Sequence, residues 1–317
     1  MALIEVEGLS ITLETPRGRV HAVRNIDLSI ERGAIHGLIG ESGCGKTITG
    51  MALPGCCRAE RRLAPAPSAL MGKELRDTAA SLHGSRIAMI SQDPAAALNP
   101  VLSIGRQMDD VLRCHRNLTR PDRRSRAVEL LAATGLPDPA QVLKSYPHQL
   151  SGGMQQRVVI AQALATGAEF LIADEPTTAL DVTIGAQVLA LLRRLVAERG
   201  LTVLMITHDM DVVAECCDRA SVLYAGNTVE EGPTTDLLTR PRHPYPRALL
   251  AALPTAAAKG HRLASVEGQI PSPATVIKGC AFAPRCSVAL AACHKIAPPR
   301  RGNAARVWLC HRVEAPA

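Results

Sequence analysis

The chain has 317 residues, 47% of them hydrophobic and 21% charged, so it can bury one large core or two ordinary ones and is not a disordered protein. Its net charge of +7 is compatible with nucleic acid, a phosphate-rich ligand or an anionic membrane surface. One Trp, three Tyr and two Phe are too few for the stacking platforms of a single-strand binder. No apolar run reaches the roughly 18 residues of a membrane span. The start MALIEVEG is acidic where a secretory signal is positively charged, so we do not expect export.

The first part of the chain predicts strands followed by a strand, loop and helix unit. Short segments from Leu3 to Ile39 alternate apolar and polar residues, which is the period of a half-buried strand. The segment Ala34–Ile39 leads into a glycine-rich turn and then into a predicted helix over Lys46–Leu53. Residues 54–84 are rich in Ala, Pro and Arg and predict irregular structure, before a short strand over Ile87–Ile90.

The second part predicts a mostly helical insertion and then a buried parallel sheet. Residues 104–142 have helical apolar spacing that ends at Pro137 and Pro139. Nearly continuous apolar strands follow at 170–173, 202–206 and 221–224, with a helix over 182–199, and strands buried on both faces indicate an α/β fold. Beyond about residue 240 the chain has little periodicity and reads as an appended region without a large core of its own. We find no internal repeat.

A phosphate-binding loop is the strongest chemical signal. Residues 40–47 fit G-x-x-x-x-G-K-[ST] and stand between a predicted strand and a predicted helix, as this motif requires. Backbone N–H groups of such a loop surround the β-phosphate, Lys46 neutralises the β and γ oxygens, and the Thr47 hydroxyl binds Mg²⁺. A chance glycine-rich turn is the alternative, which the flanking structure disfavours. The expected nucleotide-binding residues are Gly40, Glu41, Ser42, Gly43, Cys44, Gly45, Lys46, Thr47 and Ile48.

Two carboxylates, Asp174 and Glu175, directly follow the apolar strand over 170–173. Beside a phosphate loop, Asp174 can hold Mg²⁺ and Glu175 can polarise an attacking water. Two carboxylates alone would more often be a solvated strand end, so the pair gains its meaning from the loop. Loop and carboxylates together predict a nucleoside triphosphatase.

A third motif, Ser151-Gly152-Gly153, begins a predicted helix. A hydroxyl, exposed N–H groups and the positive end of the helix dipole can meet an anion there. The same residues also form an ordinary N-cap, and the two interpretations are compatible.

These motifs resemble the ATP-binding cassette (ABC) family, whose signature is Leu-Ser-Gly-Gly-Gln. Met154 replaces the final Gln without altering the Ser-Gly-Gly face. Gln92 matches the family's Q-loop, Asp181 its D-loop and His208 its switch histidine, all in order along the chain. The resemblance implies an α/β nucleotide-binding domain over residues 1–240, with a P-loop core, an N-terminal antiparallel β subdomain and a helical subdomain at about 92–160.

The resemblance also assigns roles. It implies Glu175, His208 and Gln92 as catalytic residues, Thr47, Gln92 and Asp174 around Mg²⁺, and nucleotide contacts from Ser151, Gly152, Gly153 and Asp181. By themselves Gln92 would be a surface loop residue and His208 a packed or capping histidine. The family often stacks adenine on an aromatic residue before the loop, but none occurs in residues 1–145, so we expect adenine near Leu13 or Val20.

The flanking segments resemble the oligopeptide/dipeptide importer ATPase subunits of bacteria. They are Ala97-Leu98-Asn99-Pro100, Tyr146-Pro147-His148-Gln149 and His243-Pro244-Tyr245. This implies ATP-driven import of peptides at the cytoplasmic face of the bacterial inner membrane. The implied partners are two membrane-spanning permease subunits, a second ATPase subunit, identical or paralogous, and an extracytoplasmic substrate-binding protein, with no nucleic acid. The alternatives are an importer of nickel or another small solute, a soluble ABC ATPase acting on ribosomes or DNA, and a metal-responsive binding protein.

Four cysteines, Cys280, Cys286, Cys293 and Cys310, gather in the expected C-terminal extension, residues 241–317. Disulfides are disfavoured because a nucleotide-hydrolysing cassette works where thiols stay reduced, so a metal centre is expected. The cysteines lack the paired C-x₂₋₄-C spacing that is usual for zinc, whereas iron–sulfur ligation tolerates varied spacing. In the resembled subunits such a tail is associated with a [4Fe–4S] cluster, which we expect here. Zinc and free thiols are the alternatives.

Overall fold

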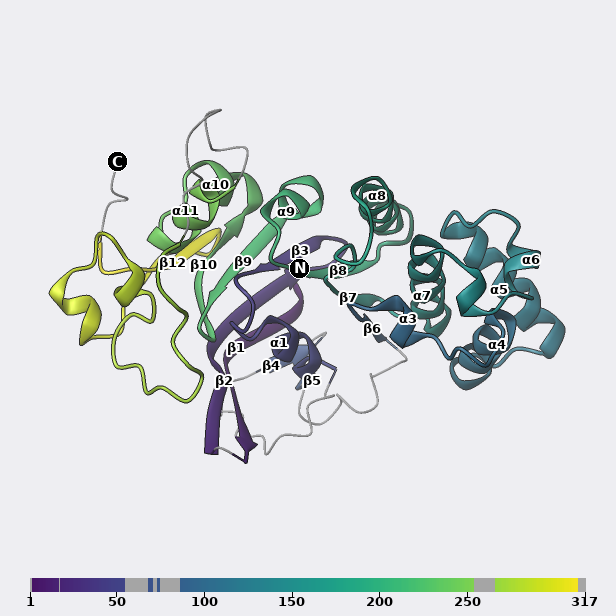
Figure 1. The fold of residues 1–317 in the computed structure, drawn as a ribbon, viewed down its shortest axis with the longest axis horizontal. Helices are drawn as coiled ribbons and strands as arrows, with labels where there is room; N and C mark the ends of the chain where they lie inside the picture. Colours follow the sequence, from purple (N-terminus) through teal and green to yellow (C-terminus); the bar gives the residue numbers. More distant parts are fainter. Residues whose placement is uncertain are drawn as a thin grey trace.

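A computed structural model of the protein describes residues 2–16, 18–54, 68–70, 73–74, 86–253 and 266–312. Its strands pair side by side in the order β5-β4-β1-β2-β10-β9-β3-β8-β7-β6, and β12 joins β10 to β11 (Figure 1). Their bounds are β1 Ala2–Thr15, β2 Gly18–Glu31, β3 Ile35–Ile39, β4 Ser68–Leu70, β5 Lys73–Glu74, β6 Ile87–Ile90, β7 Phe170–Asp174, β8 Thr202–Thr207, β9 Arg219–Tyr224, β10 Asn227–Pro233, β11 Arg300–Asn303 and β12 Arg306–Leu309.

The centre of the sheet is parallel, as the apolar runs predict. β6 pairs with β7, β7 with β8, β8 with β3 and β3 with β9, all in parallel register. Every residue of β3, β7 and β8 is buried, because helices and a second layer of strands cover both faces. The carboxyl ends of these strands meet along one edge of the sheet, where the loops that follow β3, β6, β7 and β8 are brought together.

The N-terminal strands form a long antiparallel hairpin. β1 and β2 pair from Ala2↔Glu31 to Thr15↔Gly18, with register shifts along the way. The apolar residues that alternate along them, among them Ile4, Ile26 and Ile30, are buried and pack together with Leu38 of β3. The predicted strands of this region are therefore present, although as two long strands rather than several short ones. Most of residues 54–84, for which we expect irregular structure, lie outside the described residues.

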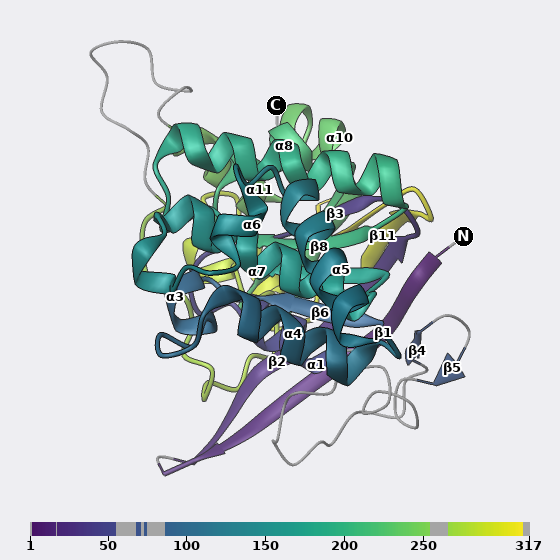
Figure 2. The same ribbon diagram turned by 90° about the vertical axis from the view of Figure 1, so that its right-hand side faces the viewer.

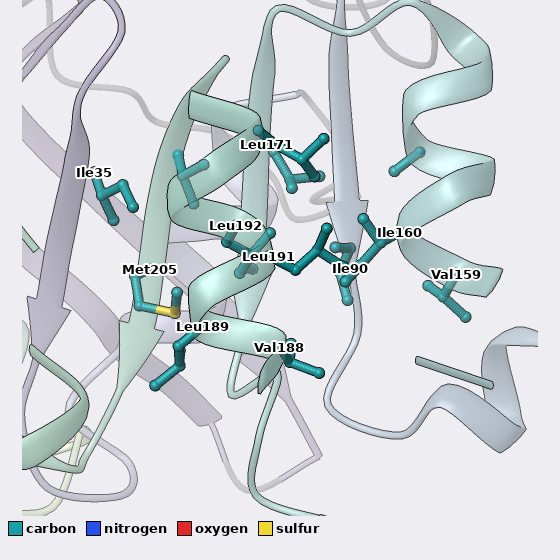
Figure 3. Close-up of a cluster of buried hydrophobic side chains, with 14 of the residues drawn as sticks. Ile35, Ile90, Val159, Ile160, Leu171, Val188, Leu189, Leu191, Leu192 and Met205 are labelled. Atoms are coloured by element: carbon teal, nitrogen blue, oxygen red, sulfur yellow. The ribbon is translucent and has the colours of Figure 1, made fainter. Parts of the chain in front are cut away.

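Helices α3 to α7 form a separate lobe beyond β6 (Figures 1 and 2), in the place of the predicted helical insertion. Figure 3 shows how α7 and α8 pack Ile160 and Leu192 against Ile90 of β6 and Leu171 of β7. The bounds are α1 Lys46–Ala52, α3 Pro94–Ala97, α4 Ile104–His115, α5 Arg120–Ala133, α6 Pro139–Val142, α7 Gly152–Thr166, α8 Val182–Arg199, α9 Met210–Cys216, α10 Thr234–Thr239 and α11 Pro244–Ala251. None of these helices is long and apolar enough to span a membrane.

The C-terminal region is more closely integrated than its sequence pattern indicates. Its strand β12 joins the central sheet by pairing with β10, and Trp308 lies opposite Glu230. The carboxylate of Glu230 is fully buried and accepts from Arg306 of β12 at 2.7 Å and from the His243 N–H at 2.7 Å. The elements here have only three to eight residues, including the 3₁₀ turns Ala283–Arg285 and Ala291–His294, so no periodicity could develop along the sequence.

Candidate nucleotide-binding site

The predicted phosphate loop connects β3 to α1. Gly43 and Gly45 have φ values of 81° and 101°, and a Cβ on Gly45 would lie 2.6 Å from the Ala22 carbonyl oxygen, so the turn requires glycine at this position. Lys46 is buried, and its Nζ donates to the carbonyl oxygens of Gly40 at 2.7 Å and Glu41 at 3.1 Å. The loop is thus wrapped around the ammonium group that would meet the phosphates.

Asp174 ends β7 beside the loop. Its carboxylate forms a hydrogen bond with the Thr47 side chain at the start of α1. Burial raises the pKa of Asp174, helped by the charge of Glu175 and opposed by the Thr47 hydrogen bond and Lys46. Within the described ranges, no group of three or more His, Cys, Asp or Glu side chains is arranged to hold a metal ion. Thr47 and Asp174 offer side-chain oxygens of the kind that Mg²⁺ binds, and the phosphates of a nucleotide and water would complete such a shell.

Glu175 contacts the other two expected catalytic residues, Gln92 and His208. It has φ 47°, in the left-handed region, and this turn directs its carboxylate across the ends of β6 and β8. His208 Nδ1 lies 2.8 Å from Oε1, while Gln92 Nε2 and Thr178 Oγ1 donate to Oε2 at 3.1 and 3.0 Å. Burial alone would raise the pKa of Glu175, but the hydrogen bonds from His208 and Thr178 outweigh it and leave that pKa below its usual value. The carboxylate is consequently ionised at neutral pH.

Ser151 is exposed at the start of α7. Its hydroxyl caps α7 by accepting from the Met154 N–H at 3.4 Å, and no hydrogen bond among the described residues joins it to the phosphate loop. Gly152 and Gly153 face Leu180 and Ile184, so the start of α7 packs beside the start of α8. Asp181 caps α8 by accepting from the Ile184 N–H at 2.9 Å.

Two contacts to the phosphate loop have no signal in the sequence. Arg285, from the C-terminal region, forms a two-pronged ion pair with the Glu41 carboxylate at 2.6 and 3.0 Å. Tyr245 of α11 accepts a hydrogen bond from the Glu41 backbone N–H at 3.0 Å. More than 200 residues separate these partners, and no local pattern marks either of them as a neighbour of the loop.

The four clustered cysteines line one cavity of about 20 Å³, together with His243 and other residues. All four are free thiols, and burial raises the pKa of Cys280 to about 11 and raises that of Cys286. These four cysteines are among the described residues, in which no arrangement of side chains suited to a metal ion occurs. The structure therefore gathers the thiols around a common space without arranging them as a ligand set.

Fold and site together define the class: an ATPase of the ATP-binding cassette type. Residues 23–178 match the ABC transporter family, and residues 229–293 match the oligopeptide/dipeptide transporter C-terminal region. The chain is 43% identical to a putative peptide import ATP-binding protein of Brucella abortus, over 93% of this chain and 90% of the relative. It is 39% identical to the oligopeptide transport ATP-binding protein OppD of Escherichia coli, over 98% and 93%.

Solved structures agree. The cassette MJ0796, in a dimeric post-hydrolysis state bound to ADP and Pi, is 26% identical with a TM-score of 0.64, covering 73% of this chain and 98% of that one. The cassette cbiO1 of Clostridium perfringens, part of an ABC transporter complex, is 26% identical with a TM-score of 0.65, over 75% and 91%. The chain belongs to the ABC transporter ATPases, in the branch that carries the oligopeptide/dipeptide transporter C-terminal region.

Proposed function

We propose that this ATPase powers the import of di- and oligopeptides through a membrane permease. The match of residues 229–293 to the oligopeptide/dipeptide transporter C-terminal region carries this proposal, because the cassette alone is shared by proteins of many functions. Relatives named for peptide import, similar over more than nine-tenths of the chain, support it. Import of nickel or action on ribosomes or DNA is not favoured by these relatives. In this proposal residues 1–240 form the ATPase and residues 241–317 the extension.

The partners follow from the same proposal. Two permease subunits would span the membrane, a substrate-binding protein outside would deliver the peptide, and two ATPase subunits would lie at the cytoplasmic face. Purified permease and binding protein reconstituted in vesicles provide the test. Peptide-loaded binding protein should stimulate ATP hydrolysis severalfold over the unloaded form. No stimulation by peptides, with stimulation by nickel or by nucleic acid instead, would contradict peptide import.

The site residues act as follows. Lys46 would hold the β and γ phosphate oxygens, and Thr47 and Asp174 would hold Mg²⁺, which would neutralise phosphate charge. Glu175 is the general base for the attacking water, and its contacts with Gln92 and His208 must rearrange to admit that water, since both carboxylate oxygens are occupied. Gln92 then orients the water and reports to the permease, and His208 contacts the γ-phosphate.

Each site needs two chains in this proposal. Ser151 and Asp181 are exposed and cap the neighbouring starts of α7 and α8, and Val182, the first residue of α8, is 91% exposed. The Ser151 surface of one chain would close over the nucleotide on the phosphate loop of the other.

Mixed chains test this arrangement. Lys46→Ala and Ser151→Arg should each be inactive alone, because each spoils both sites of its own dimer. When equal amounts of the two variants are mixed, random pairing makes half of the dimers heterodimers, and each heterodimer has one intact site out of two. Roughly a quarter of the wild-type rate should therefore return. A mixture as inactive as its components would contradict a site shared between two identical chains.

For the extension we propose a four-thiolate metal centre made by Cys280, Cys286, Cys293 and Cys310. Four soft donors are the ligand type that a [4Fe–4S] cluster or zinc takes, and they line one cavity, although the described thiols are not arranged as a ligand set and would have to move to bind a metal. The cysteine spacing favours the cluster, whereas a cavity of about 20 Å³ accommodates one atom and would have to widen for four irons. Anaerobically purified protein should be brown with about four irons per chain. One zinc, or no metal, would contradict the cluster.

A further inference from the structure

The second residue of the phosphate loop, Glu41, is held from outside the cassette core. Its backbone N–H donates to the Tyr245 hydroxyl, and its carboxylate takes both prongs of the Arg285 guanidinium. Both partners lie beyond residue 240, at the foot of α11 and in the 3₁₀ turn Ala283–Arg285. The conformation of the phosphate loop, in the first fifth of the chain, is therefore held partly by residues from the last quarter of the chain.

Arg285 is itself fixed in place. Its side chain is only 4% exposed, and its remaining N–H groups donate to the carbonyl oxygens of Glu267 at 2.9 Å and Val266 at 2.8 Å. The guanidinium lies 5.7 Å from the ring centroid of Tyr224 and donates to the hydroxyl of that residue at 3.3 Å. Phe282 and Tyr245 pack on the same ring. With so many contacts, Arg285 cannot leave Glu41 without breaking this cluster.

These contacts bear on ATP binding in two ways. The loop contains three glycines and Lys46, so holding Glu41 reduces the freedom that the loop must lose when its N–H groups converge on phosphate. The Lys46 ammonium also donates to the Glu41 carbonyl oxygen, which links the fixed backbone to the group that binds phosphate. Secondly, Arg285 neutralises a carboxylate that would otherwise repel the triphosphate.

We propose that Arg285 is a positioning residue for ATP binding, which acts through Glu41 by fixing the phosphate loop and cancelling the Glu41 charge. The ion pair makes the C-terminal region a working part of the nucleotide site. The inference concerns the ATPase and holds whatever solute is transported.

The test is calorimetric titration of the purified full-length chain with ATP in the absence of Mg²⁺, which prevents turnover. Arg285→Ala should raise the Kd for ATP about tenfold, the scale expected for losing a charge-assisted two-pronged contact. In steady state the KM for ATP should rise by a similar factor while kcat stays within about twofold, because Arg285 touches no reacting atom. Arg301→Ala is the matched control: Arg301 donates to the Cys310 carbonyl oxygen within the same region and does not contact Glu41, so its Kd should match the wild type.

A double-mutant cycle separates this role from general loosening of the fold. Adding Glu41→Gln to Arg285→Ala removes the unpaired charge and should recover part of the lost affinity. Arg285→Lys, which keeps the charge with a single contact, should give an intermediate Kd and serves if the alanine variant does not fold. An unchanged Kd in Arg285→Ala or Arg285→Lys would overturn the proposal. The proposal would also be overturned if the losses of ATP affinity in Glu41→Gln and Arg285→Ala simply added in the double variant. An equal loss of ATP affinity in Arg301→Ala would overturn it as well.

Discussion

Acid should destabilise the chain through His36, a buried histidine on β3. Burial, together with the nearby charge of Arg219, lowers the pKa of His36 from 6.5 to about 3. Its Nε2 lies 2.8 Å from the Ser221 hydroxyl, which donates to Glu231, so neutral His36 is the donor to Ser221. At pH 5 the His36 imidazole consequently stays neutral in the folded chain. In the unfolded chain the same imidazole binds a proton at that pH.

The size of the effect follows from those two pKa values. Because the pKa is depressed in the folded state, this stability is present above pH 6.5 and is lost as the pH falls toward 3. At pH 5 the gap of about 1.5 pH units below the unfolded pKa corresponds to about 2 kcal/mol. His36→Gln cannot titrate, and its amide N–H can reach the same hydroxyl, so the variant should lose about 2 kcal/mol less than the wild type between pH 7 and pH 5.

Urea unfolding of wild type and variant at the two pH values measures this difference. His115→Gln, an exchange on the exposed end of α4, controls for the loss of a histidine as such. If wild type and His36→Gln lose the same free energy of unfolding between pH 7 and pH 5, then His36 is not held neutral in the folded chain and the reasoning fails.

Three further outcomes are expected. Glu175→Gln should still bind ATP but release phosphate more slowly by a factor of about 100 or more, as expected for loss of a general base; a wild-type rate would rule out that role. Lys46→Ala should instead weaken ATP binding itself in the same titration, and tight binding would show that the ammonium does not meet the phosphates. Gly153→Ala should lose about 1–3 kcal/mol in urea unfolding, because its Cβ would lie 2.5 Å from Ile184 Cγ2. Adding Ile184→Leu, which lacks that methyl, should restore stability, and Gly152→Ala, with ordinary contacts only, should be tolerated.

The centre of the site was predictable from the sequence because its determinants are local. The strand, glycine turn and helix around Lys46 form one continuous segment, and Asp174 ends a strand whose other residues are all apolar. Gln92, Glu175 and His208 are far apart along the chain, yet each follows a strand, and parallel strands place their carboxyl ends on one edge. Their meeting at Glu175 follows from that geometry.

The C-terminal contacts were not predictable for the opposite reason. Arg285 and Glu41 are joined across 244 residues, and nothing next to either residue reveals the other. The strands β11 and β12 have four residues each, too few to show an alternating pattern among the arginines around them. Tertiary packing alone, above all the buried pair of Glu230 and Arg306, selects the pairing of β12 with β10, and β11 then pairs with β12.

The position of Trp308 gives the protein a built-in optical reporter. It is the only tryptophan of the chain, and it lies on β12, opposite Glu230 and within 5.6 Å of the Arg242 guanidinium. Its indole emission therefore arises from the strand that fastens the C-terminal region to the sheet, and no other residue of the chain emits indole fluorescence. A red shift of that emission marks undocking of the region, so its attachment can be followed in the unlabelled protein separately from unfolding of the ATPase core.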